Sequence, residues 1–198
     1  MERTFDFITD TCCGMPQEYI EAHGVTVLPL GYTIAGETYG GIEGKQLPPK
    51  EFYRLLREGN VCHTFQVTAE QAKPSVEASF KAGRDVVIVT FSSALSGTAS
   101  SFTIAANELM EKYPARKAFI VDSLGGSLGE GMLLEYLVKK ADAGASIEEV
   151  YAYGDWLRHR IAYLFTVDDL DCLRRGGRIS GAVAVVGKLL KIKPLLHA

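Results

Sequence analysis

One apolar run constrains the fold of this chain more than any other feature. Residues 85–91 are apolar nearly throughout instead of alternating, which is typical of a central parallel strand covered on both faces. Shorter apolar runs at 5–8 and 118–121 also stop at polar residues that lead into helical patterns. This alternation predicts a three-layer α/β/α domain with a parallel sheet over residues 1–144.

The alternation of apolar strand runs and helical patterns changes from residue 145, and we predict part of a second, mixed-sheet α/β domain over 145–198. Ser146 and Glu149 form a capping box for a helix that reaches about Arg160. The further expected elements are a strand at 161–167, a helix start at 168–169, a turn at 175–178 and a strand at 191–196. This span is too short to bury a stable hydrophobic core on its own.

The sequence also indicates a hairpin and two helices outside the strands of the parallel sheet. Residues 31–39 indicate a small hairpin, and residues 48–58 carry apolar side chains at helical spacing. Thr68 and Gln71 form a second capping box, although Pro74 inside that helix predicts a kink or a later start.

Charge and hydropathy exclude several classes of protein. A net charge of -3, a pI near 5.8 and the lack of a Lys/Arg run argue against nucleic-acid binding. The chain has neither a signal-peptide pattern nor an apolar window of about 18 residues. We therefore expect a cytoplasmic protein without integral membrane association. Its four cysteines lack Cys-x-x-Cys spacing and its four histidines are scattered, so we expect reduced thiols and no metal site.

The candidate site is a hydroxyl-rich loop at the end of the 85–91 strand. Its hydroxyl residues, directly ahead of a helix, are Ser92, Ser93, Ser96 and Thr98, with Thr64 available nearby. The unpaired N–H groups and the dipole of a helix start favour an anion. Because the loop has no Lys or Arg, it suits one modest negative charge such as a carboxylate. The alternative is that these hydroxyls only cap the helix and satisfy their own loop.

An enzyme remains a second hypothesis. A serine-dependent hydrolase or phosphotransferase would use Ser92, Ser93 or Ser96 and would need a base within hydrogen-bond reach. The phosphate-loop and nucleophile-elbow motifs are absent. Asp10 and Asp122 could form a carboxylate pair, although strand-end aspartates also commonly cap loops. A structural or regulatory fragment is the third hypothesis.

Read in order, the segments of the whole chain resemble the DegV family. The similar segments are Phe7-Ile8-Thr9-Asp10-Thr11, Val27-Leu28-Pro29-Leu30, Thr64-Phe65-Gln66, Ser92-Ser93-Ala94-Leu95-Ser96-Gly97-Thr98, Val121-Asp122-Ser123, Leu173-Arg174-Arg175-Gly176-Gly177-Arg178-Ile179-Ser180 and Lys191-Ile192-Lys193-Pro194. The resemblance implies two dissimilar α/β domains, the first with a parallel sheet in order 2-1-3-4.

The resemblance also implies a function. A long-chain fatty acid would be the ligand, with no other cofactor. Its carboxylate would be gripped chiefly by Thr64 and Ser96, and its tail would lie in an apolar tunnel of the second domain. Such proteins do not catalyse; they present the acid to a separate ATP-dependent fatty-acid kinase that makes an acyl phosphate. Arg174, Arg175 and Arg178 are candidate docking residues for that kinase, with solvated charges around a Gly-Gly turn as the alternative.

Two departures from the family pattern stand out. Phe65 replaces a serine, which removes one donor and is expected to add bulk beside the carboxylate. Family members also continue well past Lys193-Pro194, so we expect this chain to be truncated and part of the tunnel wall to be missing.

Overall fold

The computed structural model describes residues 3–41, 44–167, 170–179 and 195–197. Its contacts divide the chain into two compact units, Met1–Ile161 and Ala162–Ala198. This division falls later than the boundary at 144/145 that the sequence predicted. The reason is helix α6 (Ile147–Arg158), whose buried Ile147 and Val150 belong to the same core as Leu137 of helix α5 (Ser127–Asp142).

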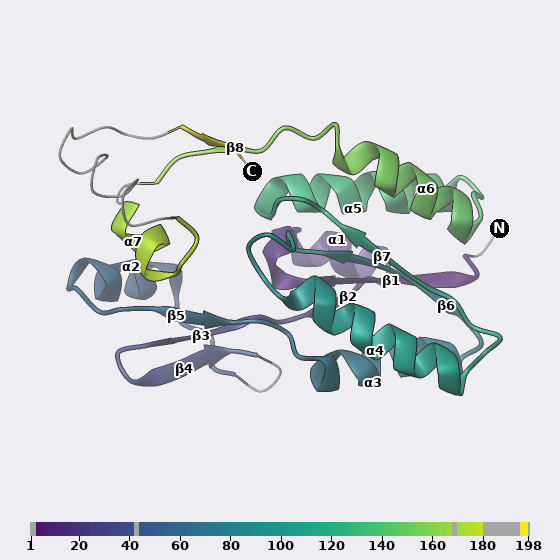
Figure 1. Ribbon diagram of the computed structural model, residues 1–198, viewed down its shortest axis with the longest axis horizontal. Coiled ribbons are helices and arrows are strands. Elements are labelled where there is room, and N and C mark those ends of the chain that lie inside the picture. Colours follow the sequence, from purple (N-terminus) through teal and green to yellow (C-terminus); the bar gives the residue numbers. More distant parts are fainter. Residues whose placement is uncertain (1–2, 42–43, 168–169, 180–194, 198) are drawn as a thin grey trace. The chain divides into compact units, whose positions relative to one another are not determined.

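The first unit is built on a four-stranded parallel sheet in the order β2-β1-β6-β7 (Figure 1). The strands are β1 (Phe5–Asp10), β2 (Thr26–Leu28), β6 (Asp85–Thr90) and β7 (Ala118–Asp122). Counted among the parallel strands alone, this is the predicted order 2-1-3-4. β6 lies between β1 and β7, with Val87 paired to both Phe7 and Phe119. Its interior residues are fully buried, which explains why the strand is apolar throughout.

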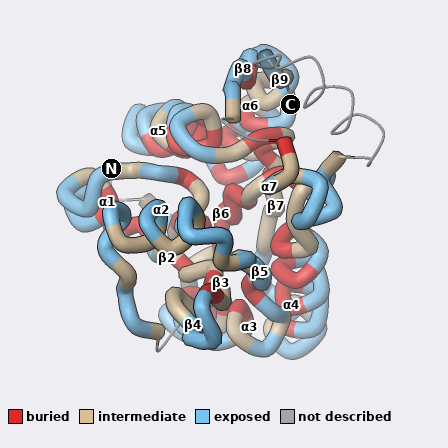
Figure 2. The backbone as a smooth tube through the Cα atoms, turned by 90° about the vertical axis from the view of Figure 1, so that its left-hand side faces the viewer, coloured by how far each residue is buried: buried red, intermediate tan, exposed pale blue. Residues whose placement is uncertain are grey.

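Helices cover both faces of this sheet, which confirms the predicted three layers. One face carries α3 (Ala69–Lys81) and α4 (Thr98–Lys112), and the other carries α1 (Gln17–Ala22), α5 and α6. Because strand side chains alternate, Ile8 and Ile88 pack with Phe102 of α4, whereas Phe7 packs with Leu133 of α5. Burial is accordingly concentrated on the strands and the helix sides that face them (Figure 2).

The helix ends follow the signals in the sequence. Both capping boxes form, Thr68 with Gln71 and Ser146 with Glu149, so α3 begins at Ala69 and Pro74 does not delay its start. Five of the described helices share one hydrogen-bond pattern at their C-terminal ends, with a left-handed glycine at Gly24, Gly59, Gly83, Gly144 and Gly177. After α3, for example, the N–H groups of Gly83 and Arg84 donate to the carbonyls of Phe80 and Ser79.

A small antiparallel sheet is inserted between β2 and α3. It contains β4 (Glu37–Gly40), β3 (Gly31–Ile34) and β5 (His63–Phe65), in that order, and α2 (Pro49–Arg57) lies between β4 and β5 in the chain. The sequence predicted the β3–β4 hairpin and α2. It did not predict β5, which pairs with β3 and places Thr64 opposite Tyr32.

The second unit contains β8 (Leu164–Phe165), α7 (Leu170–Arg175) and β9 (Leu196–His197), and β8 pairs with β9 antiparallel. The strand predicted at 161–167 is therefore shorter than expected. The helix start predicted at 168–169 and residues 191–194 of the predicted last strand lie outside the described residues.

Candidate functional site

The carboxyl ends of β1 and β6 mark the topological switch point of the sheet. The chain leaves β1 for one face, through the 3-10 helix η1 (Thr11–Cys13) and α1, and leaves β6 for the opposite face through α4. Such divergence opens a crevice where α/β proteins bind ligands. Asp10 spans this point, since its carboxylate accepts the N–H groups of Cys12 at 2.8 Å and Phe91 at 2.9 Å. Asp10 is fully buried, and burial raises the pKa of its carboxyl group.

Ser92 shapes the loop that follows β6. Its side chain is buried, and its N–H donates to the carbonyl of Gly125 at 2.8 Å. Its carbonyl accepts the N–H groups of Leu95 and Ser96, each at 3.0 Å, and its hydroxyl accepts the N–H of Ala94 at 3.3 Å. Ser92 is thus held by its own loop and by the loop that follows β7.

Ser93 is held by the end of the neighbouring strand. Its hydroxyl donates to Oδ2 of Asp122 at 2.5 Å, and its N–H donates to Oδ1 at 3.1 Å. The same Oδ1 accepts the N–H of Leu124 at 3.0 Å. A serine hydroxyl has one proton, so in this arrangement Ser93 has none left for a ligand. Asp122 and Asp10 are each occupied by separate loop groups and share no recorded hydrogen bond.

Ser96 and Thr98 form a hydroxyl pair at the start of α4. Their oxygens lie 2.9 Å apart, and the N–H of Thr98 donates to Oγ of Ser96 at 3.3 Å. Thr98 is fully buried, whereas Ser96 is half-buried. The pair has two hydroxyl protons and uses one between its own oxygens. When Thr98 donates, the hydroxyl proton of Ser96 remains available to an anion at the helix start.

Thr64 lies on β5 of the small sheet. It is exposed and directly opposite Tyr32, which is itself opposite Tyr39, so these three side chains share one face of the small sheet. The Tyr32 and Tyr39 rings are stacked with centroids 5.5 Å apart. Beyond β5, Nε2 of Gln66 donates to Oγ of Ser101 in the first turn of α4 at 2.9 Å. This hydrogen bond joins the segment that carries Thr64 to the helix that follows Ser96.

Phe65 lies on the other face of β5. It pairs with Gly31, and a Cβ placed on Gly31 would overlap the Phe65 ring, so the ring fills the space that a glycine leaves open. Successive strand residues point to opposite faces. The ring is therefore directed away from the face of the small sheet that carries Thr64.

Glu130, which no sequence motif marked, is a buried carboxyl in the first turn of α5. Its Oε1 accepts the Thr9 hydroxyl at 3.3 Å, and its Oε2 has no hydrogen-bond partner within the described part of the chain. Burial, reinforced by the charge of Asp10, raises the pKa of Glu130 to about 9. The sequence did indicate that Glu130 is buried, because it stands four and seven residues before Leu134 and Leu137. This helical spacing places it on the same buried face of α5 as those leucines.

The three candidate docking arginines belong to the second unit. Arg174 pairs with Asp171 at 3.1 Å, and Arg175 is exposed at the end of α7. The N–H of Arg178 donates to the carbonyl of Leu173, and Gly177 is left-handed, so the predicted Gly-Gly turn is the C-terminal cap of α7.

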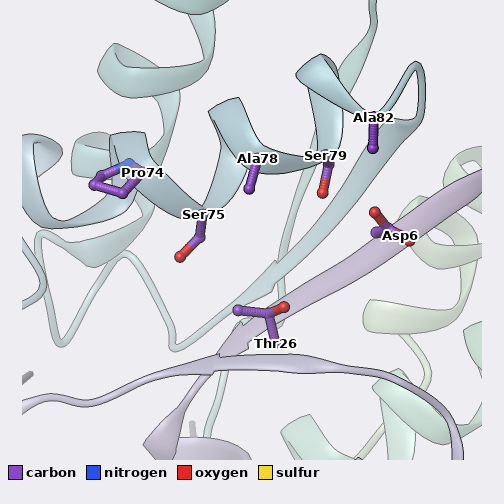
Figure 3. Close-up of a pocket in the computed structure, with 7 residues that line it drawn as sticks. All are labelled: Asp6, Thr26, Pro74, Ser75, Ala78, Ser79 and Ala82. Atoms are coloured by element: carbon purple, nitrogen blue, oxygen red, sulfur yellow. The ribbon is translucent and has the colours of Figure 1, made fainter.

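Other features of the described residues are peripheral to this site. An open hollow of about 480 Å³ lies between α3 and the strands β1 and β2, and contains none of the predicted site residues (Figure 3). Its acidic member, Asp6, pairs with Arg84 at 2.7 Å. Among the residues described, no three or more His, Cys, Asp or Glu side chains are grouped to hold a metal ion. Over the same residues, no helix combines the length and apolarity needed to cross a bilayer.

Comparison with known proteins identifies the family. The model of the family described as "Uncharacterised protein, DegV family" matches residues 4–198. A DegV domain-containing protein of Clostridium perfringens is 38% identical over 98% of this chain and 67% of its own length. A fatty-acid-binding DegV family protein from Thermus thermophilus is 33% identical, with a TM-score of 0.85 over 99% of this chain and 68% of that structure. A stearic-acid-binding protein from Eubacterium ventriosum is 26% identical, with a TM-score of 0.86 over 96% and 66%. The chain belongs to the DegV family.

Proposed function

We propose that this chain binds one long-chain fatty acid without catalysis, with the carboxylate held between Thr64 and Ser96. The observation that carries the proposal is the similarity over 99% of the chain to a DegV structure solved as a fatty-acid-binding protein. The bacterial relative that binds stearic acid shares the same fold over 96% of the chain.

The chemistry of the site supports an amphiphile. The Ser96–Thr98 pair and the first N–H groups of α4 are donors for an anion. The stacked Tyr32 and Tyr39 rings give an apolar surface on the face of the small sheet that carries Thr64. A carboxylate needs donors, whereas its hydrocarbon chain needs apolar contacts. In this proposal Ser92 and Ser93 act indirectly by shaping the loop, and Thr98 acts by orienting Ser96.

The proposed role is that of a carrier. A separate ATP-dependent kinase would act on the held acid, with a carboxylate oxygen attacking the γ-phosphorus of ATP and the bond to ADP breaking. The products would be an acyl phosphate and ADP. Arg174, Arg175 and Arg178 of the second unit are the proposed docking residues, because Arg175 and Arg178 are exposed and the helix cap fixes their backbone.

A serine-dependent enzyme receives less support. A serine nucleophile needs a base within hydrogen-bond reach. In the described part of the chain, the Ser96 hydroxyl bonds the hydroxyl and N–H of Thr98, neither of which is a base. The Ser93 hydroxyl does meet a carboxylate, that of Asp122, but this carboxylate also accepts the N–H groups of Ser93 and Leu124 and so holds the loop together. Ser92 is buried within its own loop. The carrier is therefore the better account of this loop.

The direct test is native mass spectrometry of the purified chain, followed by denaturing extraction and identification of the lipid. We expect one fatty acid per chain, or uptake of one equivalent of added stearic acid. The Ser96→Ala variant should carry less of it. A folded chain that neither contains nor takes up a fatty acid would contradict the proposal.

A further inference from the structure

Gln66 lies between the two segments that bear the proposed carboxylate donors. Its amide nitrogen donates to Ser101 at 2.9 Å, and Ser101 is buried in the first turn of α4. A Cβ placed on Gly97 would overlap the Gln66 side-chain amide, chiefly at Oε1. The amide therefore extends along this turn from Gly97 to Ser101 and occupies the space that any side chain at Gly97 would need.

This contact is close to both donors along the chain. Thr64 is two residues before Gln66, which limits their Cα separation to about 7 Å. Ser96 directly precedes Gly97. On the other side of Gln66, Val67 is buried in the core beneath α3 and α4, and Thr68 caps α3. The segment is thus fixed after Gln66, and the amide contact links the residue that follows β5 to the first turn of α4.

We propose that Gln66, packed against Gly97, is a positioning residue that keeps the Thr64 and Ser96 hydroxyls at a fixed separation, so that one carboxylate can accept from both. This inference rests on the proposed function. A hydrogen bond weakens steeply once its distance and angle leave a narrow range. Groups that grip a ligand must therefore be held within about 0.5 Å by the residues around them.

Gly97 offers a way to disturb the amide without removing it. Its φ of -77° is ordinary for any residue, so alanine fits the backbone there. The added methyl group would overlap the far end of a flexible side chain, which can swing aside while the helix stays folded. If Gln66 is already alanine, the methyl group meets no amide. The two substitutions should therefore not add.

The experiment measures stearic acid affinity, by displacement of a fluorescent fatty acid, for the unmodified chain, Gln66→Ala, Gly97→Ala and the double variant. We expect each single variant to bind about three- to tenfold more weakly, and the double variant to bind no more weakly than Gln66→Ala. Because Gln66 is exposed, the melting temperature of the Gln66→Ala variant should stay close to that of the unmodified chain. Gln17→Ala, which removes an exposed glutamine of α1 bonded to Glu21, is the matched control and should bind normally.

The outcomes separate this inference from the function on which it rests. If the unmodified chain binds stearic acid and Ser96→Ala weakens that binding, but Gln66→Ala does not, the positioning role is wrong and the carrier function stands. Fully additive losses in the double variant would also overturn the positioning role. If the unmodified chain takes up no fatty acid, the proposed function fails, and this inference fails with it.

Discussion

The carboxylate of Asp122 holds Ser93 twice, through its N–H at 3.1 Å and through its hydroxyl at 2.5 Å. This pair fastens the loop after β6 to the end of β7. It also distinguishes two serines that look equivalent in the sequence. The Ser93 hydroxyl already donates its one hydrogen bond to Asp122 of β7, whereas the Ser96–Thr98 pair has one hydroxyl proton left to donate to a ligand.

The two serines should therefore respond differently to truncation. Ser96→Ala removes a proposed direct donor and should weaken fatty-acid binding by about 1–3 kcal/mol. Ser93→Ala should weaken binding less, and should lower the free energy of unfolding by about 1 kcal/mol through loss of the Asp122 contact. Isothermal titration with stearic acid and urea unfolding measure the two effects. Equal loss of affinity in both variants would argue that Ser93 also contacts the ligand.

Glu130 should make stability depend on pH. Its folded pKa of about 9 lies above the value of about 4.3 for an unfolded glutamate, so the folded chain keeps a proton that the unfolded chain releases. This contribution favours folding fully below about pH 4.3 and declines as the pH rises towards 9. Glu130→Gln should therefore be more stable than the unmodified chain at pH 8, by roughly 1–3 kcal/mol, and the gain should shrink towards pH 5.

Melting temperatures measured between pH 5 and pH 9 check this prediction. Glu135→Gln removes a carboxyl from the same helix that is paired with Lys139 at the surface, and should not show the same gain. If the melting temperatures of Glu130→Gln and of the unmodified chain change with pH in parallel, Glu130 is ionised in the folded protein.

Phe65 should matter for the small sheet and not for the carboxylate. Phe65→Ser removes the ring that covers Gly31 on the face away from Thr64. We expect stearic acid affinity to change less than about twofold, and the loss of a cross-strand contact to cost up to about 1 kcal/mol locally. Hydrogen exchange of the β3 and β5 amides should then become faster. A large gain in affinity would instead place the ring beside the ligand.

The cap of α3 should anchor the segment that carries Thr64. Thr68→Ala removes the hydroxyl that accepts the N–H of Gln71 at 3.3 Å and should lower the free energy of unfolding by about 1 kcal/mol. Ser146→Ala breaks the same motif at α6 and should cost a similar amount without changing fatty-acid affinity. Denaturant unfolding of both variants measures this. A negligible effect of Thr68→Ala would mean that the core contacts of Val67 suffice.

Local signals predicted much of this fold. The apolar 85–91 run became the buried β6, and both capping boxes formed where their spacing indicated. The third strand of the small sheet was missed because His63, Thr64 and Phe65 are all exposed and show no alternation of polarity. Its pairing with β3 depends on residues about thirty positions away, which no local pattern encodes.

The geometry of the candidate site was predicted in outline only, and its role in binding stays a prediction. The hydroxyl loop and the strand ends could be chosen because the carboxyl ends of parallel strands gather at one edge. The sequence could not show which hydroxyl remains free to donate to a ligand. That depends on the hydrogen bond from Ser93 to Asp122, which lies twenty-nine residues further along the chain. Gln66 was part of a recognised segment, but its bond to Ser101 spans thirty-five residues.

The small sheet enters and leaves the first unit between β2 and α3, so residues 31–66 form a cassette within one crossover of the parallel sheet. The cassette brings Thr64, while the scaffold brings Ser96. In the proposed site, the two carboxylate donors therefore come from two separate stretches of sequence. Because β3, β4 and β5 pair with one another and not with the parallel strands, substitutions in the cassette leave the buried strands of the larger sheet in place.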